Sequence, residues 1–152
     1  MSGVAELSSG ALAAALDADP SAVFLDVRTV EEFVAGHSPR ALNVPLYVRS
    51  PASGMVVDNE EFLAVVRAVV PRGAMVYCGC AHGVRSLHAA WILQREGWSR
   101  LGNLTAGWDG KRDFLGRVIE PGWVEAGLPV SSGEGDERSY RALRRSAGAA
   151  HA

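Results

Sequence analysis

Two short segments of this 152-residue chain are apolar on both faces. Residues 22–27 read Ala-Val-Phe-Leu-Asp-Val, and residues 74–78 read Ala-Met-Val-Tyr-Cys. Strands with this pattern are typical of a parallel sheet that helices cover on both sides. Segments of helical character alternate with them along the chain. The sequence therefore predicts an α/β fold with a central, mostly parallel sheet flanked by helices.

The remaining elements are predicted from periodicity and capping signals. Weaker strands are expected at residues 41–44 and 101–104, and helices at residues 7–17, 29–35, 59–69 and 86–97. The expected N-caps are Ser8 or Ser9, Thr29 with Glu32 in a capping box, Asn59 and Ser86. Residues 47–57 are expected to form a loop. Residues 105–130 are expected to be irregular, with short helices.

The length of the chain allows one domain with a real core. We assign residues 1–131 to that domain, because the composition changes after it to a Ser- and Gly-rich linker. Residues 132–152 then carry a small basic cluster, composed of Arg138, Arg141, Arg144 and Arg145. This polar and basic tail is interpreted either as a flexible end or as a short docking helix.

Charge and hydropathy exclude several classes of partner. The 15 Lys and Arg residues nearly balance the 17 Asp and Glu residues, which leaves a net charge of -2. This balance favours neither nucleic acid nor an anionic membrane surface as a partner. No apolar run approaches the roughly 18 residues of a membrane helix, and the first residues do not resemble a signal peptide. We therefore expect a cytoplasmic protein.

The chain has two cysteines, Cys78 and Cys80, separated by one glycine. A disulfide between them would be strained and would close only a trivial loop. A zinc site would need His82 and His88 as further ligands, and this alternative stays open. A reactive or buried thiol is the better prediction, with no metal and no cofactor.

Cys80 lies in a position that favours chemistry. It follows a buried strand and precedes a predicted helix, and ligands of open α/β sheets bind beyond the carboxyl ends of the strands. A loop above a helix N-terminus also directs backbone N–H groups inward, where thiolates and anionic substrates are favoured. Gly83 permits the tight curl of such a loop. The alternative is that Cys80 is simply a small buried apolar residue.

Several separate motifs, in order along the chain, resemble the rhodanese family. They are Asp26-Val27-Arg28, Glu32-Phe33, Gly36-His37, Ala41-Leu42-Asn43-Val44-Pro45, the loop Cys80-Ala81-His82-Gly83-Val84-Arg85-Ser86, Leu104-Thr105-Ala106-Gly107 and Gly127-Leu128-Pro129-Val130. The resemblance covers about residues 7–131. It implies a single-domain, rhodanese-like sulfurtransferase of the thiosulfate sulfurtransferase type.

The resemblance also implies a mechanism of double displacement. Cys80 would take a sulfane sulfur from a donor, hold it as a persulfide and pass it to an acceptor such as cyanide or a thiol. The loop residues Ala81 to Ser86 would bind the transferred group. Because Ala81 is not basic, mercaptopyruvate-like donors and persulfides stay open as donors beside thiosulfate. A sulfur-carrier protein is a possible partner.

Loop length separates this interpretation from a related class. Phosphatases with the same fold have a loop one residue longer between cysteine and arginine, whereas Cys80 and Arg85 are separated by four residues. Counting from Cys78 gives six, which fits neither class. Cys80 is therefore the predicted nucleophile.

The supporting residues predicted for the site are Asp26, Arg28 and Glu32. Arg85 is expected to close the loop through an ion pair with Asp26 or Glu32, or to neutralise an anion. For Arg28, an ion pair and an approach to the substrate stay equally open, and for Glu32 the capping box is a sufficient role.

The remaining candidates are assigned mainly structural roles. Cys78 and the tryptophans Trp108 and Trp123 are expected in the core, and His37 is expected to form a structural hydrogen bond. His88 is expected on a helix face, and His82 could lend positive charge to the donor site.

Two further functions stay open. One is a persulfide relay or binding module that acts with a protein partner. The other is a redox protein that uses the Cys78/Cys80 pair.

Overall fold

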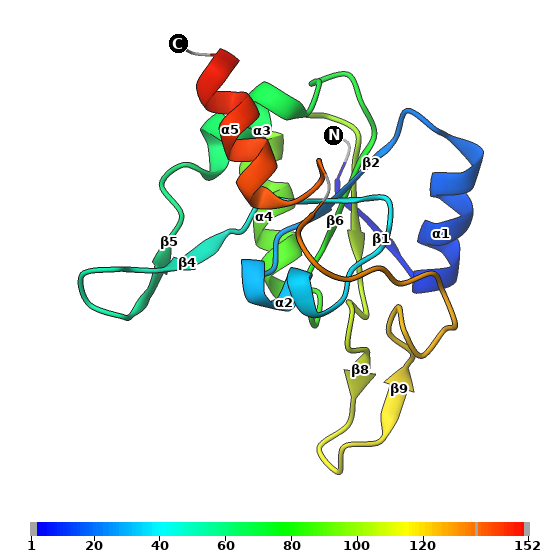
Figure 1. Cartoon of the computed structure of the whole chain (residues 1–152). Helices are drawn as coiled ribbons and strands as arrows, with labels where there is room; N and C mark the ends of the chain where they lie inside the picture. Colours follow the sequence, from blue (N-terminus) through cyan, green and yellow to red (C-terminus); the bar gives the residue numbers. More distant parts are fainter. Residues whose placement is uncertain (1–2, 136, 151–152) are drawn as a thin grey trace.

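The computed structural model describes residues 3–135 and 137–150. Its central sheet has five strands in the order β1-β7-β6-β2-β3, and every neighbouring pair is parallel (Figure 1). The strands are β1 (Ala5–Leu7), β2 (Val23–Asp26), β3 (Ala41–Asn43), β6 (Val76–Gly79) and β7 (Leu101–Leu104). The predicted α/β fold with a parallel sheet is confirmed.

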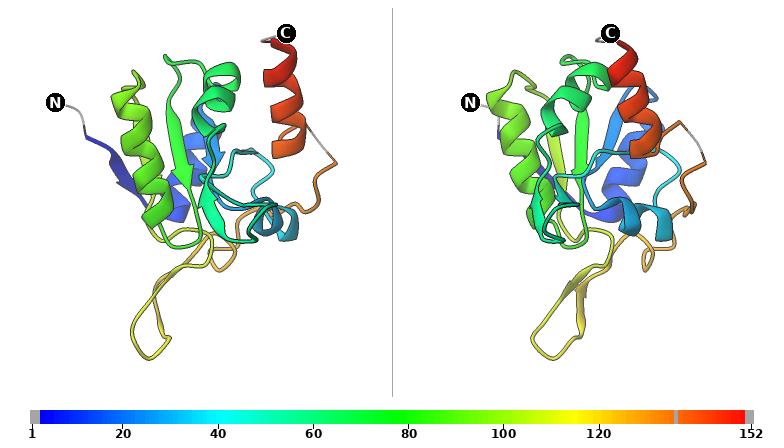
Figure 2. Two further views of the ribbon diagram at one scale, coloured as in Figure 1. Left: turned by 90° about the vertical axis from the view of Figure 1, so that its left-hand side faces the viewer. Right: turned by 60° about the vertical axis from the view of Figure 1, so that its left-hand side comes forward.

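Helices cover both faces of this sheet (Figure 2). They are α1 (Ser9–Ala18), α2 (Val30–Ala35), α3 (Phe62–Val69), α4 (Val84–Arg95) and α5 (Tyr140–Ala150). On one face, Leu12 and Leu16 of α1 pack with Phe24 of β2 and Tyr77 of β6. On the other face, the buried side chains of α3, α4 and α5 pack with the alternate residues of the same two strands, which include Cys78. None of the helices in the described ranges is long and apolar enough to cross a membrane.

Two predicted loop regions contain β-hairpins. Residues 47–57 were expected to form a loop, but β4 (Tyr47–Arg49) pairs antiparallel with β5 (Val56–Asp58). Residues 105–130 were expected to contain short helices, but β8 (Lys111–Arg112) pairs with β9 (Val118–Glu120) instead. These strands are two or three residues long and mostly exposed, so they lack the hydrophobic alternation by which strands are predicted.

The helix boundaries confirm some of the predicted caps and contradict others. Ser8 caps α1 through its side chain, and Thr29 and Glu32 form the predicted capping box of α2. The prediction that Asn59 caps the next helix is wrong, because α3 begins at Phe62. The Asn59 amide group instead donates hydrogen bonds to the Pro45 carbonyl and to the Tyr140 hydroxyl, which ties this turn to α5.

The C-terminal segment contains a helix that packs on the domain. Tyr140, Leu143 and Ala147 of α5 are buried in the core that α3 and the sheet share, and α5 lies alongside α3 (Figure 1). This is the arrangement of a docking helix. Helix α5 carries the arginines of the basic cluster from Arg141 on, and Arg144 pairs with Glu61 at the start of α3.

Candidate active site

The Cys80 loop lies between the end of β6 and the start of α4. β6 ends at Gly79, and α4 begins at Val84, after Gly83 as its N-cap residue. Gly83 has a positive φ of 88°, and a Cβ there would lie 2.3 Å from the carbonyl oxygen of Thr105. Only glycine fits this curl, because the backbone conformation and the space both exclude a side chain.

A second segment supports the loop from outside. The backbone N–H of Trp108 donates to the Cys80 carbonyl at 2.8 Å, and that of Asp109 donates to the Ala81 carbonyl at 3.0 Å. Gly107 approaches so closely that a Cβ would lie 2.3 Å from the Ala81 oxygen. The carbonyls of Cys80 and Ala81 are therefore hydrogen-bonded to this second segment, which holds the loop in its curled conformation.

The sulfur of Cys80 is surrounded by hydrogen-bond donors. The backbone N–H of Gly83 lies 3.1 Å from Sγ and that of Ser86 lies 3.3 Å from it, and the Ser86 hydroxyl oxygen is also at 3.3 Å. The first N–H groups of a helix have no partner within the helix, and they lie at the positive end of its dipole. This arrangement stabilises negative charge on the sulfur of Cys80, a residue that is 2% exposed.

The prediction that Ser86 caps α4 is wrong. The helix begins at Val84, two residues before Ser86. Its N-cap residue is Gly83, which has no side chain that could form a capping hydrogen bond. Ser86 lies inside the first turn, fully buried, with its hydroxyl between Cys80 Sγ and the side chain of Asn103. The serine thus belongs to the sulfur site rather than to the helix cap.

Arg85 pairs with Glu32, one of the two acids that the sequence left open. Two hydrogen bonds join them, at 2.8 and 3.0 Å, and they connect α4 to α2. Partial burial opposes the charge of Glu32, but the hydrogen bonds from Arg85 and Thr29 outweigh it and lower the pKa of Glu32 from 4.5 to about 2. The same pair raises the pKa of Arg85. Glu32 therefore has a second role that its capping box did not reveal.

Arg28 forms an ion pair with Asp26. Its Nη2 lies 2.8 Å from Asp26 Oδ2, and it also donates to the Gly36 carbonyl at 2.7 Å. The guanidinium carbon lies 4.6 Å from the centroid of the Trp108 ring. Arg28 is buried, with 3% exposure, so its contacts are those of an ion pair rather than of a group that approaches a substrate.

The other loop residues differ in exposure. Ala81 is buried, whereas Val84 is 76% exposed at the start of α4. The His82 side chain is exposed at the outer rim, with Nε2 4.0 Å from Asp109 and Nδ1 3.3 Å from the Gly110 carbonyl. His82 thus faces solvent and an acidic neighbour instead of the sulfur.

The remaining candidates have structural surroundings. Cys78 is fully buried on β6, and burial together with the nearby Cys80 raises its pKa from 9.0 to about 12. His37 is 1% exposed, and its Nδ1 lies 2.7 Å from the Phe33 carbonyl. Trp123 is buried in the α1 side of the core, whereas Trp108 is half-buried against Arg28.

A metal site has no support in the described ranges, where no group of three or more His, Cys, Asp or Glu side chains is arranged to hold an ion. His88 is exposed on α4. The zinc alternative therefore lacks a ligand set within those ranges.

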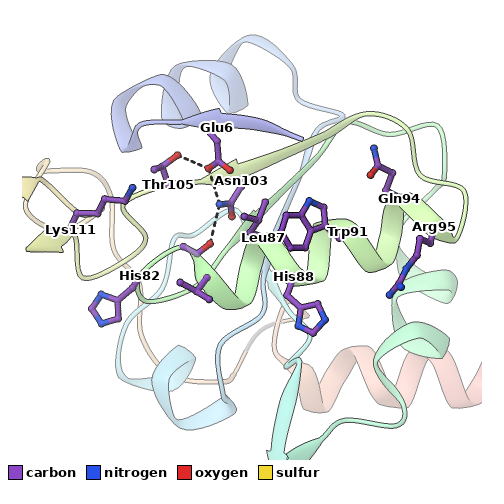
Figure 3. Close-up of a pocket in the computed structure, with 12 residues that line it drawn as sticks. Glu6, His82, Leu87, His88, Trp91, Gln94, Arg95, Asn103, Thr105 and Lys111 are labelled. Atoms are coloured by element: carbon purple, nitrogen blue, oxygen red, sulfur yellow. Dashed lines mark hydrogen bonds between the residues drawn. The ribbon is translucent and has the colours of Figure 1, made fainter. Parts of the chain in front are cut away.

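A surface groove of about 910 Å³ lies beside the loop, between α4 and the strands β1 and β7 (Figure 3). His82 stands at one end, and the half-exposed Trp91 lines its helical side. Glu6 and Asn103 line its strand side, whereas Cys80 is not among its lining residues. The groove therefore does not open onto the sulfur of Cys80.

Asn103 is a residue of the site that the sequence did not reveal. It is 2% exposed on β7, it accepts the hydroxyl proton of Ser86, and it donates to the Gly83 carbonyl at 3.1 Å. A polar residue within the buried strand 101–104 was the only signal that could have identified it.

Comparison of the sequence with known protein families shows the family to which this chain belongs. A model of the rhodanese-like domain matches residues 8–112. The chain belongs to the rhodanese-like family. The match ends before residue 131, and the predicted domain boundary there stays a prediction.

Relatives of this rhodanese-like chain have names from sulfur chemistry. It is 37% identical over 109 residues to thiosulfate sulfurtransferase 16, chloroplastic, of Arabidopsis thaliana. The matched region covers 72% of this chain and 79% of that protein. It is 28% identical over 117 residues to the putative sulfur carrier protein YrkF of Bacillus subtilis. The matched region covers 77% of this chain and 54% of that protein. Against two plant relatives at 41% and 38% identity, the rhodanese-like chain spans only 50% and 62% of their lengths.

A solved structure shares the fold over most of the chain. The crystal structure of Rv0390 from M. tuberculosis superposes with a TM-score of 0.71 at 27% identity, and the match covers 87% of this rhodanese-like chain and 100% of the other.

Proposed function

We propose that this rhodanese-like protein is a sulfurtransferase that carries a sulfane sulfur as a persulfide on Cys80. The observation that supports this most directly is the cradle around Sγ, in which the backbone N–H groups of Gly83 and Ser86 donate to the sulfur at 3.1 and 3.3 Å. Such a cradle favours an anionic sulfur before and after the transfer, because donors that are already in place need no reorganisation. Relatives named thiosulfate sulfurtransferase support the same chemistry.

In the first half-reaction, the Cys80 thiolate attacks the outer sulfur of the donor. A bond forms between Sγ and that sulfur, and the bond between the outer sulfur and the rest of the donor breaks. The leaving group departs with the electron pair, as sulfite if the donor is thiosulfate. The protein then holds a persulfide whose terminal sulfur would accept hydrogen bonds from the N–H groups of the loop.

In the second half-reaction, a thiophilic acceptor attacks the terminal sulfur. The bond between the two sulfurs breaks, and Sγ leaves as the thiolate from which the cycle began. Cyanide and thiols are suitable acceptors, and a sulfur-carrier protein is a possible partner. The cycle needs no cofactor, because no net oxidation occurs and the cysteine itself carries the sulfur.

The charges around the loop favour a donor with little negative charge. Arg28 and Arg85 are each held by a carboxylate, so neither offers a free positive charge to a dianion. Ala81 and Val84 supply no charge from the loop itself. We therefore expect persulfides or mercaptopyruvate-like donors to load Cys80 faster than thiosulfate does.

The test is to load the purified protein with excess thiosulfate or with a low-molecular-weight persulfide, remove the donor, and measure the intact mass. We expect a gain of one sulfur, about 32 Da, that cyanide discharges. The gain should be absent in Cys80→Ser and retained in Cys78→Ser, which is the matched control two positions earlier in the chain and in the same core cluster. An adduct that survives in Cys80→Ser would refute the assignment of the nucleophile.

A persulfide relay is the second candidate, and the similarity to a putative sulfur carrier protein supports it. A relay would load from a protein persulfide and turn over small donors slowly, so the rate with each donor separates the two functions. The redox alternative is weakened by Cys78, because a buried thiol with a pKa of about 12 is a poor partner for disulfide exchange. The cytoplasmic location stays a prediction.

A further inference from the structure

Asn103 holds its side-chain oxygen against the sulfur site in one orientation. Its amide nitrogen donates to Glu6 Oε1 at 2.9 Å and to the Gly83 carbonyl at 3.1 Å (Figure 3). Both partners are acceptors, so they fix which end of the amide carries the protons. The oxygen Oδ1 is therefore directed at the Ser86 hydroxyl, which lies 2.5 Å away.

The hydroxyl of Ser86 has one proton and two neighbours that can accept it. Asn103 Oδ1 lies at 2.5 Å and Cys80 Sγ at 3.3 Å. Oδ1 carries no proton of its own, so the short contact requires the serine proton to lie between Oγ and Oδ1. While the proton lies there, it cannot form a hydrogen bond with the sulfur of Cys80.

We propose that Asn103 is a positioning residue that competes with Cys80 for the Ser86 proton and so sets the pH range in which Cys80 is nucleophilic. The inference rests on the proposed role of Cys80. With the thiol protonated, Ser86 donates to Asn103, and the S–H group points to the Ser86 oxygen. When the thiol proton leaves to solvent, the Ser86 hydroxyl turns to the thiolate and gives up its bond to Asn103.

Because of this competition, a hydrogen bond from the Ser86 hydroxyl to the thiolate carries a free-energy penalty. The thiolate gains a hydrogen bond from Ser86 only when Oδ1, which is buried, loses its partner, and an unsatisfied buried acceptor is unfavourable. Asn103 thus restrains the ionisation of Cys80 while its amide protons hold Gly83 and the loop in place. A variant without Oδ1 releases the hydroxyl to the sulfur.

Other titratable and charged groups also surround the loop, from every element packed against it. They are Cys78 on β6, Asp26 and Arg28 at the end of β2, Glu32 on α2, Arg85 on α4, Glu6 on β1, and His82 with its neighbour Asp109 at the rim. All of them remain in a variant of Asn103 or Ser86, so a comparison of such variants isolates the hydroxyl proton.

The experiment measures the rate of alkylation of Cys80 by iodoacetamide against pH in the full chain, with the labelled cysteine identified by peptide mass. The proteins are the wild type, Asn103→Leu, Ser86→Ala and the double variant. Asn103→Leu should lower the midpoint of the alkylation curve by about one pH unit, a tenfold gain in thiolate below the midpoint. In the Ser86→Ala background, the same substitution should leave the midpoint unchanged.

A shift of equal size in both backgrounds would overturn the proposal, because it would show a general effect on the loop rather than on the Ser86 proton. An unchanged midpoint in Asn103→Leu would overturn it as well. Thermal unfolding checks each fold, and if the leucine variant does not fold, Asn103→Ala, which has no bulk to clash with Glu6 or Gly83, takes its place. Alkylation needs no sulfur donor, so a failure of persulfide loading would count against the proposed function alone.

Discussion

Two pairs of carboxylate and arginine stand beside the Cys80 loop, and they differ in burial and in what they connect. Asp26 and Arg28 are two residues apart at the end of β2, and their side chains are 5% and 4% exposed. Glu32 and Arg85 are 53 residues apart, on α2 and α4, and their side chains are 34% and 26% exposed. One pair closes a strand end locally, whereas the other joins two helices across the loop.

The difference assigns the two pairs different tasks. A buried ion pair contributes little net stability, but removal of one partner leaves an uncompensated charge in the core. A partly exposed pair is screened by water and contributes little to stability either way. Arg85 is the second residue of α4, so its bond to Glu32 positions the first turn of this helix, from which Ser86 reaches the sulfur. We therefore expect the first pair to govern folding and the second to govern the reaction.

The largest expected effect is that of Arg28→Met. It leaves Asp26 buried without its partner, and it removes the bond to Gly36 and the contact with Trp108. The free energy of unfolding should fall by about 3–5 kcal/mol, measured by urea denaturation. The double variant Asp26→Asn/Arg28→Met, which removes the charge as well, should recover part of that loss. A loss below about 1 kcal/mol would show that the pair is not needed for folding.

A smaller effect on stability and a clear effect on the reaction are expected for Arg85→Met. Because the pair with Glu32 is partly exposed, the free energy of unfolding should fall by about 1 kcal/mol or less. Persulfide loading should slow by about tenfold, since the first turn of α4 loses its connection to α2.

Arg85→Lys is the control for this prediction. Lysine keeps the charge but cannot form the two-point contact with a carboxylate, so its loading rate should lie between those of the wild type and Arg85→Met. If Arg85→Met destabilises the protein as much as Arg28→Met does, the two pairs do not divide folding and reaction between them.

The parts of this comparison that could be predicted from sequence are those with a local pattern. The strands β2 and β6 were predicted because both are apolar on two faces, and Cys80 was placed correctly because it follows one of them directly. The capping box of Thr29 and Glu32 was predicted from their spacing alone. The choice of partner for each arginine was not predictable, because it depends on how α2 and α4 pack in three dimensions.

Two errors at the site have a common cause. Ser86 was predicted to be a cap because a hydroxyl precedes an apolar run, but the positive φ of Gly83 allows α4 to begin earlier. Asn103 is marked locally only as a polar residue in a buried strand, and its role does not follow from that, because its partners Glu6, Gly83 and Ser86 come from other parts of the chain. Both residues gain their function from contacts between elements, which periodicity and capping rules do not describe.

The smallest expected effect is the dependence of stability on pH through Glu32. Its pKa is lowered in the folded protein from 4.5 to about 2, so the folded state holds the carboxylate where the unfolded chain would take up a proton. Its contribution to stability is therefore fully present above about pH 4.5 and is lost as the pH falls toward 2.

Glu32→Gln keeps an oxygen for the Thr29 capping bonds but carries no charge. The difference in urea midpoint between wild type and Glu32→Gln should be constant above about pH 5 and should shrink steadily between pH 4.5 and 2. A difference that stays unchanged down to pH 2 would show that it does not come from the ionised carboxylate, and that the pair of Glu32 with Arg85 contributes nothing to folding.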